Sequence, residues 1–286
     1  MSDIFSDLES FGLDKFSEID IYGDKKENEG LKEGAAANKA PVVNEKDLIF
    51  NKTYNCVVCG ANFKAKMVRA GKARNLGHDD DLRPRYERID VIKYEVLMCP
   101  YCGYAALMKN FQDITPTMRM LIRDNISSNF KHRDFTGDIY TYDEAIERYK
   151  IALLNSIIKR SKVSERAYTC LKLSWLYRGK AENLPIDTHN YEEELDECRK
   201  NEDEFTKKAY EGFTQALANE LFPICGMDEP TLSYIMGVLA RKCKDYNNSM
   251  RLFGSIILSR SAGSNLKESA REQKQILVRE MKNDLN

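Results

Sequence analysis

The chain has 286 residues, of which 42% are hydrophobic and 31% are charged, so it can form one large or two small globular domains. Its 44 basic and 45 acidic side chains give a net charge of −1, which excludes a protein drawn to nucleic acid or anionic membranes by its overall charge. No run of 18 apolar residues occurs, so no segment is expected to span a bilayer. The start, MSDIFSDLES, lacks the basic and apolar regions of a secretion signal, which predicts a cytoplasmic location.

Residues 1–22 combine acidic side chains with a dense apolar pattern that is roughly helical through Leu8 and Phe11. The apolar residues are Ile4, Phe5, Leu8, Phe11, Leu13, Phe16, Ile19 and Ile21. This composition is typical of a docking motif, which packs either on its own protein or on a partner. Residues 23–46 contain few large apolar groups and cannot offset their ordering entropy, so they are expected to form a flexible linker.

Residues 47–110 read as a small β domain with 11 basic and 7 acidic residues. Apolar and charged residues alternate in two runs, as expected for half-buried strands. The alternating apolar residues are Phe63, Ala65 and Met67 in the first run, and Ile92, Tyr94, Val96 and Met98 in the second. Each run adjoins a pair of cysteines, an arrangement that predicts a two-stranded ribbon.

Two Cys-x-x-Cys-Gly motifs, YNCVVCG at 54–60 and MCPYCGY at 98–104, are the strongest chemical signal. They place Cys56, Cys59, Cys99 and Cys102 in two tight turns whose backbone amides are expected to point at the sulfurs. In a reducing cytoplasm such pairs more often hold a metal than form disulfides. Four thiolates close a tetrahedral site and leave no position for water or substrate, so the pattern predicts structural rather than catalytic Zn²⁺.

Iron is the rival metal, because the same two motifs resemble those of rubredoxin and spacing alone does not select the metal. Rubredoxins, however, are small and strongly acidic with a shorter gap, whereas this region is basic.

The charged stretch between the cysteine pairs allows a second reading, in which the ribbon binds nucleic acid. Its basic residues are Lys64, Lys66, Arg69, Lys72, Arg74, Arg83, Arg85 and Arg88, and the aromatic residues available to stack on bases are Tyr86, Tyr94, Tyr101 and Tyr104. Three consecutive acidic residues, Asp79, Asp80 and Asp81, partly cancel this charge, so a salt-bridged loop is the competing interpretation.

The other chemistry-bearing residues fit structural roles. His78, His132 and His189 are isolated in the sequence and are expected on the surface. The cysteines without ligand spacing are expected to be small buried residues, as is the single tryptophan; these are Cys170, Cys198, Cys225, Cys243 and Trp175. Because no GxSxG, GxxxxGK[ST], GxGxxG or HExxH motif occurs, we expect no enzymatic activity.

Helices are predicted after residue 110. Thr115-Pro116 reads as an N-cap followed by a first-turn proline, and Thr141-x-x-Glu144 as a capping box that opens a helix to about Lys159. Further helices are predicted over about 164–178, 191–219, 230–243, 246–259 and 265–283.

A small-x3-aromatic motif recurs in these helices. It reads Ala145-x3-Tyr149-x2-Ala152, then Ala209-x3-Phe213-x2-Ala216, then more loosely Ser249-x3-Phe253-x2-Ile256. Small residues around an aromatic ring let a neighbouring helix approach closely, as in the second helix of a tetratricopeptide repeat. In the preceding helix, Gly237 is expected to allow the same close packing. A generic helical bundle is the alternative.

Several of these stretches together resemble one protein family. They are YNCVVC, DDDLRPRY, the strand into CPYCGYAA, and Trp175-Leu176-Tyr177-Arg178. Over about residues 47–260 the chain resembles the bacterial domain-of-unknown-function 2225 proteins. The resemblance implies a cytoplasmic zinc ribbon with a tetratricopeptide-like tail, and it implies no activity.

The expected fold class is therefore α+β, with a small four-cysteine zinc ribbon followed by an all-α helical-repeat domain. The predicted segments are a docking motif (1–22), a linker (23–46), the ribbon (47–110), a helical connector (111–140) and the repeats (141–286). The preferred function is a non-enzymatic adaptor that binds protein partners through its repeats and its N-terminal motif. A nucleic-acid-binding regulator and a rubredoxin-like iron redox protein are the alternatives.

Overall fold

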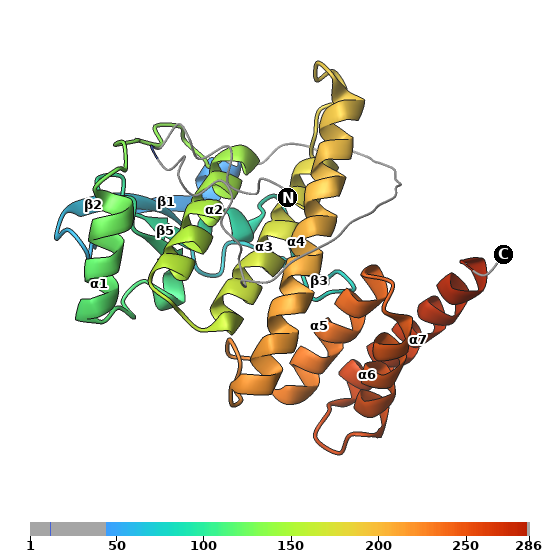
Figure 1. Ribbon diagram of the computed structural model, residues 1–286. Helices are drawn as coiled ribbons and strands as arrows, with labels where there is room; N and C mark the ends of the chain where they lie inside the picture. Colours follow the sequence, from blue (N-terminus) through green and yellow to red (C-terminus); the bar gives the residue numbers. More distant parts are fainter. Residues whose placement is uncertain (1–11, 13–43, 285–286) are drawn as a thin grey trace.

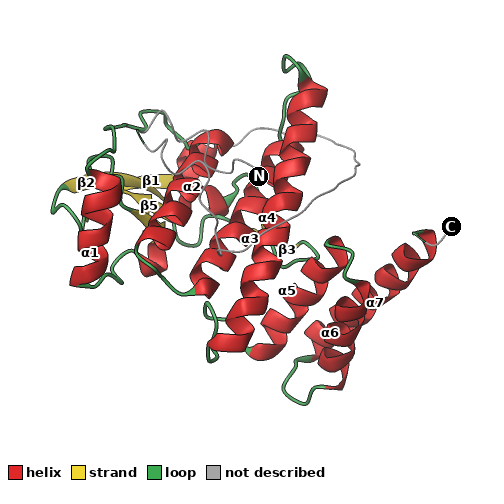
Figure 2. Cartoon of the chain, viewed as in Figure 1, coloured by secondary structure: helices red, strands yellow, loops and turns green. Residues whose placement is uncertain are grey.

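The computed structural model describes Gly12 and residues 44–284, so nearly all of the predicted docking motif and most of the linker lie outside the described residues. The described chain has two regions, a set of short strands near its start and an array of α-helices after it (Figures 1 and 2). We call them the head (residues 45–111) and the array (residues 142–283). The architecture is α+β, as expected.

The head contains three two-stranded antiparallel sheets. The paired strands are β1 (Ile49–Asn55) with β2 (Asn62–Val68), β3 (Asn75–His78) with β4 (Pro84–Tyr86), and β5 (Val96–Met98) with β6 (Ala105–Leu107). Each cysteine pair forms the turn of its own hairpin, β1–β2 or β5–β6. The two predicted strands, β2 and β5, therefore do not pair with each other to form the expected ribbon.

The second predicted strand begins later than its apolar alternation indicates. Residues Val91–Tyr94 form a 3₁₀ turn, η4, and only Val96–Met98 are extended. Asp90 caps this turn by accepting a hydrogen bond from the backbone N–H of Ile92 at 3.1 Å. The prediction was wrong here because a side-chain cap decided the local conformation, while the alternating residues are buried in either case.

Seven α-helices follow in the described residues, close to the predicted ranges: α1 (Pro116–Ile122), α2 (Tyr142–Ile158), α3 (Val163–Glu182), α4 (Tyr191–Asn219), α5 (Glu229–Lys242), α6 (Tyr246–Leu258) and α7 (Ser264–Asn283). Thr115 caps α1, and Thr141 with Glu144 forms the predicted capping box of α2. The 3₁₀ turns η3 (Glu45–Leu48) and η5 (Met108–Asn110), and the π-helical segment η6 (Arg123–Ser127) that continues α1, complete the described elements. None of these helices combines the length and apolar character needed to cross a bilayer.

In the array each helix from α2 to α6 packs on the next one, and α5 also contacts α7 (Figure 1). The close approach of α5 and α6 depends on Gly237, because a Cβ there would lie 2.7 Å from the ring of Phe253. The small and aromatic positions of the recurring motif are buried in α4 and α6. In α2 the motif contacts the head instead of a neighbouring helix: the hydroxyl of Tyr149 donates to the carbonyl of Ile92 at 2.9 Å.

A continuous apolar core joins the head to the array through α2, which packs on β5 and β6. A separate apolar cluster lies under α5–α7 and includes Tyr234, Val238, Phe253, Ile256, Ala270 and Leu277. The far end of the array therefore has a cluster of its own, whereas the head shares the continuous core with α2 to α6 and has a second, small cluster of Ile49, Ile89, Tyr94 and Tyr140.

Candidate metal centre

The two hairpin turns bring the four predicted cysteines together, although 39 residues separate the pairs. Their four sulfur atoms all lie within 4.8 Å of one another. The Sγ atoms of Cys56 and Cys102 are 3.6 Å apart, and those of Cys59 and Cys99 are 3.7 Å apart. A metal–sulfur bond of about 2.3 Å in a tetrahedron requires sulfurs about 3.8 Å apart, so the cluster has the dimensions of a tetrathiolate site.

The backbone of each turn is shaped by the glycine after the second cysteine. Gly60 and Gly103 have φ angles of 78° and 70°, a left-handed conformation that other residues rarely adopt. Their N–H groups donate to the carbonyls of Cys56 at 2.8 Å and Cys99 at 3.1 Å. Gly103 has a second constraint, because a Cβ there would lie 2.4 Å from the ring of Phe130.

The crowded sulfurs shift each other's pKa values in opposite directions. Hydrogen bonds from the thiols of Cys102 and Cys99, and from backbone N–H groups of the first turn, lower the pKa of Cys56 to about 2. The thiol of Cys102 is hydrogen-bonded to Cys56 and Cys99 and is buried, and both effects raise its pKa. One thiolate among protonated thiols is thus the favoured state of the bare sulfurs, and a bound cation would favour ionisation of all four.

Side chains from the helical part of the chain hold both turns in place. Arg123 donates from Nε and Nη2 to the carbonyl of Val58 at 3.0 and 2.6 Å. Asn155, on α2, donates to the carbonyl of Gly103 at 2.9 Å. Each helical group satisfies a carbonyl that a tight turn leaves unpaired, so the sulfur positions depend on packing as well as on the turns.

The guanidinium of Arg148, also on α2, makes a third clamp. It donates to the carbonyls of Lys93 and Val96 and lies 3.8 Å from the centre of the Tyr140 ring. The guanidinium is fully enclosed, and burial lowers its pKa. Arg148 therefore connects α2 to the strand that leads into the second cysteine turn.

The charged stretch between the cysteine pairs is bound to the array by ion pairs. Arg178, of the Trp-Leu-Tyr-Arg element in α3, contacts Asp81 at 2.5 Å and Asp79 at 3.0 Å. It also contacts Glu202 of α4 at 2.8 Å. Burial alone would raise the pKa of Asp81, but the hydrogen bonds and charge of Arg178, with the charge of Lys242, hold this pKa well below its usual range.

Arg83 and Arg85 extend these contacts on the same loop. Arg83 pairs with Asp90 at 2.9 Å and with Glu182 of α3 at 3.2 Å, and Arg85 binds both carboxylate oxygens of Glu182. We call the whole set the acidic-loop network; its further pairs are Arg241 with Asp80 and Glu280, Arg85 with Asp79, and Lys242 with Asp81 and Glu202. It joins the head to α3, α4, α5 and α7.

Sequence reasoning missed the pairing within this network. The acidic triplet and Trp175–Arg178 were each recognised as distinctive, but nothing in the sequence indicated that they touch. A weak signal was present: three adjacent acidic residues are costly unless cations neutralise them.

The network also changes which residues are available to nucleic acid. Arg83 and Arg85 are engaged in it, Tyr94 and Tyr104 are buried, and Lys66 is buried with its amine on the carbonyl of Phe135. The exposed members of the predicted basic and aromatic sets are Lys64, Arg69, Lys72, Arg74, Arg88 and Tyr101.

The remaining predicted residues lie mostly where expected. His78, His132 and His189 are exposed, while Trp175, Cys170 and Cys198 are buried. Cys225 and Cys243 are only half-buried, which differs from the prediction: Cys225 lies in the turn between α4 and α5, and Cys243 directly follows the end of α5.

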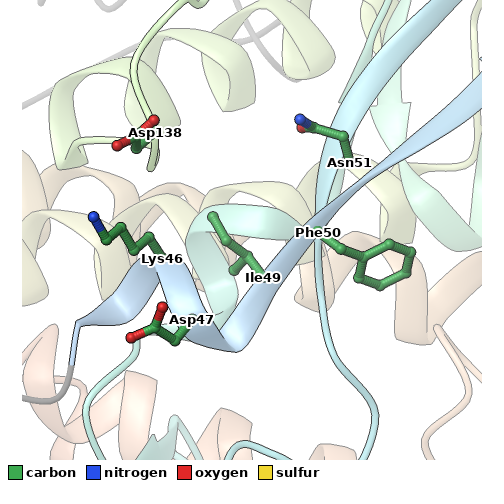
Figure 3. A pocket seen from close by; sticks show the side chains of 6 residues that line it. All are labelled: Lys46, Asp47, Ile49, Phe50, Asn51 and Asp138. Carbon is green, nitrogen blue, oxygen red and sulfur yellow. The ribbon is translucent and has the colours of Figure 1, made fainter.

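Two hollows on the described surface are large enough to hold a small ligand. The first, of about 260 Å³, lies beside β1 and is lined by Lys46, Asp47, Ile49, Phe50, Asn51 and Asp138 (Figure 3). The second, of about 500 Å³, lies beside the acidic-loop network, where Lys93 is paired with Glu45 at 2.8 Å and Arg83 with Asp90. No serine, cysteine or histidine lines either hollow, so neither presents a familiar nucleophile–base pair.

Comparison with known proteins places the chain in a family. Searches of curated proteins and of solved structures gave no significant match. Residues 49–277 match the family described as "Uncharacterized protein conserved in bacteria (DUF2225)". This match includes all four cysteines, the acidic-loop network up to Lys242 and Arg241, and most of the array. The chain belongs to the bacterial DUF2225 family.

Proposed function

We propose that the protein is a non-enzymatic adaptor whose head is stabilised by structural Zn²⁺ and whose helical array binds a protein partner. The observation that carries the proposal is the four-sulfur cluster, in which every ligand position of a tetrahedral ion would be taken by cysteine. Such an ion builds structure and offers no site for substrate.

Zinc is preferred to iron because the head is basic, whereas rubredoxins are small and strongly acidic. Both metals fit four sulfurs at these distances, so the metal is tested spectroscopically. Protein purified without oxygen should contain zinc and remain colourless after one-electron oxidation, for example by ferricyanide. A red protein with ferric tetrathiolate absorption would replace this proposal with the redox alternative.

The array supports the partner-binding part of the proposal. Its helices contact mainly their sequence neighbours, and the packing of Gly237 on Phe253 is the kind found in tetratricopeptide-like repeats. Two large apolar side chains are exposed near the ends of α4 and α6: Leu221, which follows α4, is 92% exposed, and Leu258, the last residue of α6, is 84% exposed. Single exposed apolar residues are ordinary on protein surfaces, so these two leucines are candidate partner contacts that the experiment below tests.

The test compares partner capture by the full chain with capture by charged variants. Leu221→Asp and Leu258→Asp should each reduce the recovery of the same proteins at least tenfold in a quantitative pulldown. Ile186→Asp, in the loop between α3 and α4 and 86% exposed, is the matched control and should leave recovery unchanged. Equal recovery by all variants, or no protein enriched by the wild-type chain, would contradict the adaptor function.

A further inference from the structure

The basic charge of the head is concentrated in its first hairpin and in the turn that follows it. Residues 48–78 contain six basic residues and no acidic one, although the whole chain has a net charge of −1. Lys66, one of the six, is buried with its amine on the carbonyl of Phe135. The other five are exposed, and none of them forms an ion pair within residues 44–284; they are Lys52, Lys64, Arg69, Lys72 and Arg74.

The acidic residues that follow this stretch are paired with other cations. The pairs are Asp79 and Asp81 with Arg178, Asp80 with Arg241, Glu87 with Arg88, Asp90 with Arg83, and Glu95 with Lys172. The acidic loop is thus neutralised by its own arginines and by the array. The exposed cations of the first hairpin remain available to a negatively charged ligand.

Two further carboxylates lie near the start of β1. Asp47 and Asp138 line the hollow beside this strand together with Ile49 and Asn51. Successive side chains of a strand point to opposite faces, and the ring of Phe50 points away from both carboxylates (Figure 3). These carboxylates therefore do not cover the face from which the Phe50 ring projects.

Aromatic rings lie beside two of the exposed cations on that face. The guanidinium of Arg69 lies 5.5 Å from the centre of the Phe50 ring, and the amine of Lys52 lies 5.2 Å from that of Tyr54. Phe50 is 38% exposed, and Tyr54 is half-buried. Phe50, Lys52 and Tyr54 are alternate residues of β1, so they share one face and follow each other about 7 Å apart.

The turn after β2 continues this surface. The backbone N–H of Lys72 donates to the carbonyl of Arg69 at 3.2 Å, so the turn holds Lys72 beside Arg69. Lys64 is not part of it, because Lys64 pairs with Thr53 and projects from the other face of the hairpin. We call the set the basic surface; it consists of Phe50, Lys52, Tyr54, Arg69, Lys72 and Arg74.

We propose that the basic surface binds single-stranded nucleic acid. Proteins that bind single strands without sequence preference combine cations along the backbone with aromatic rings on which the bases stack. A duplex keeps its bases stacked on each other, and an acidic protein has no bases to stack, so neither uses the rings in this way. The proposal goes beyond the adaptor function, because it concerns the head and not the array.

The number of cations sets the expected salt dependence. Each phosphate contact contributes about −0.7 to the slope of log affinity against log salt for a single strand, so four contacts give a slope of about −2.8. The affinity should then fall about 50-fold between 50 and 200 mM salt. A Kd of about 100 μM at 200 mM, ordinary for non-specific binding, corresponds to about 2 μM at 50 mM.

Fluorescence anisotropy of the zinc-loaded full chain with a labelled 12-nucleotide oligothymidylate tests the charge part of the proposal. The variant Lys52→Gln/Lys72→Gln/Arg74→Gln keeps only Arg69 and should reduce the slope to about −0.7. The control removes the same charge from exposed residues of the array and should keep the wild-type slope; it is Arg251→Gln/Arg260→Gln/Arg279→Gln. Metal content and exchange protection of the head show that each variant is folded.

The stacking part is tested by Phe50→Ala. Loss of one stacked base should weaken binding of the single strand about tenfold, while the salt slope and the binding of a 12-base-pair duplex stay unchanged. Phe222→Ala is the matched control, because Phe222 is also 38% exposed but lies in the loop between α4 and α5. It should bind the single strand like the wild type.

Three results would overturn the proposal. The first is no binding of the single strand by 100 μM protein at 50 mM salt. The second is a duplex bound as tightly as the single strand, which would show that the bases are not read. The third is equal affinity for a 12-residue polyglutamate together with no effect of Phe50→Ala, which would assign the basic surface to an acidic protein instead.

Discussion

The head and the array are stabilised by different kinds of interaction. The head consists of three hairpins with strands of three to seven residues, and four sulfurs meet where the turns of two of these hairpins come together. The array consists of helices of 13 to 29 residues, each packed on its neighbour, with a separate apolar cluster under α5–α7. Two-stranded hairpins are marginal on their own, whereas helical arrays gain stability step by step along the chain. A destabilising substitution in the head should therefore reduce exchange protection throughout the head, whereas one in α5–α7 should reduce protection only in those helices.

The largest expected effect follows removal of one sulfur. Cys99→Ser opens the four-cysteine site, and a structural zinc site contributes on the order of 10 kcal/mol of apparent binding free energy. We expect loss of the metal and fast hydrogen exchange throughout the head, while α5–α7 stay protected. Cys198→Ser, at a buried cysteine of α4, is the control and should keep the metal. A protected, metal-loaded head in Cys99→Ser would contradict the comparison.

Breaking the acidic-loop network should have the next largest effect. Arg178→Met leaves Asp81 buried without its main cation, which costs about 3–5 kcal/mol of unfolding free energy. Chemical denaturation measures the loss, and exchange should increase in both 79–86 and 241–242. Arg271→Met removes an exposed pair with Glu268 on α7 and should cost at most about 1 kcal/mol. Similar losses in the two variants would show that the network does not join the regions.

The same interaction gives a dependence on pH. The folded-state pKa of Asp81 is lowered, chiefly by Arg178 acting against burial, so its carboxylate stabilises the fold at pH values above its ordinary pKa of about 3.9. This stability is lost as the pH falls below that value towards the lower folded pKa. The free-energy difference between wild type and Asp81→Asn should be constant above about pH 5 and shrink below about pH 4. A difference that does not change with pH would contradict this role for Asp81.

The two turn glycines provide a matched pair within the head. Gly60→Ala and Gly103→Ala both force alanine into a left-handed conformation, at about 1–2 kcal/mol. Only at Gly103 does the new Cβ also meet the Phe130 ring, which adds about 1–3 kcal/mol. In thermal denaturation, Gly103→Ala should therefore have a clearly lower melting temperature than Gly60→Ala. Equal melting temperatures would mean that Phe130 does not cover the second turn.

The smallest effects are expected in the far array. Gly237→Ala pushes against the Phe253 ring and should cost about 1–3 kcal/mol, with faster exchange confined to α5–α7. Gly254→Ala, on α6, meets open space and should stabilise the helix by about 0.5–1 kcal/mol. Faster exchange in the head of Gly237→Ala would show that the two regions are not separable.

The comparison also explains what the sequence predicted well. Helix α4 was predicted with its observed limits, and α2 was predicted from its capping box, because helical signals are local in the chain. The four cysteines were identified from two spacings for the same reason. These features need no knowledge of which distant segments meet.

Other features depend on tertiary contacts and could not be predicted. Arg178 and Asp81 are 97 residues apart, and the formal charges of a chain with 89 charged residues do not specify their partners. The recurring motif predicts that Tyr149 faces a neighbouring helix, yet its hydroxyl donates a hydrogen bond to Ile92 in the head. A buried aromatic residue at this position can pack against either a helix or the head, and the sequence does not distinguish the two. The alternation over residues 91–94 predicts a strand, yet they form a 3₁₀ turn that the Asp90 side chain caps, and Lys93 is buried together with its apolar neighbours.

The central claim is that one metal ion, held by four sulfurs from two distant turns, builds the head. It is tested most directly by measuring metal content and thiol reactivity of protein purified under reducing conditions, before and after chelation. We predict one zinc ion per chain, and the appearance of four additional reactive thiols together with loss of exchange protection in the head when zinc is removed. A metal-free protein whose head is fully protected from exchange would contradict the claim.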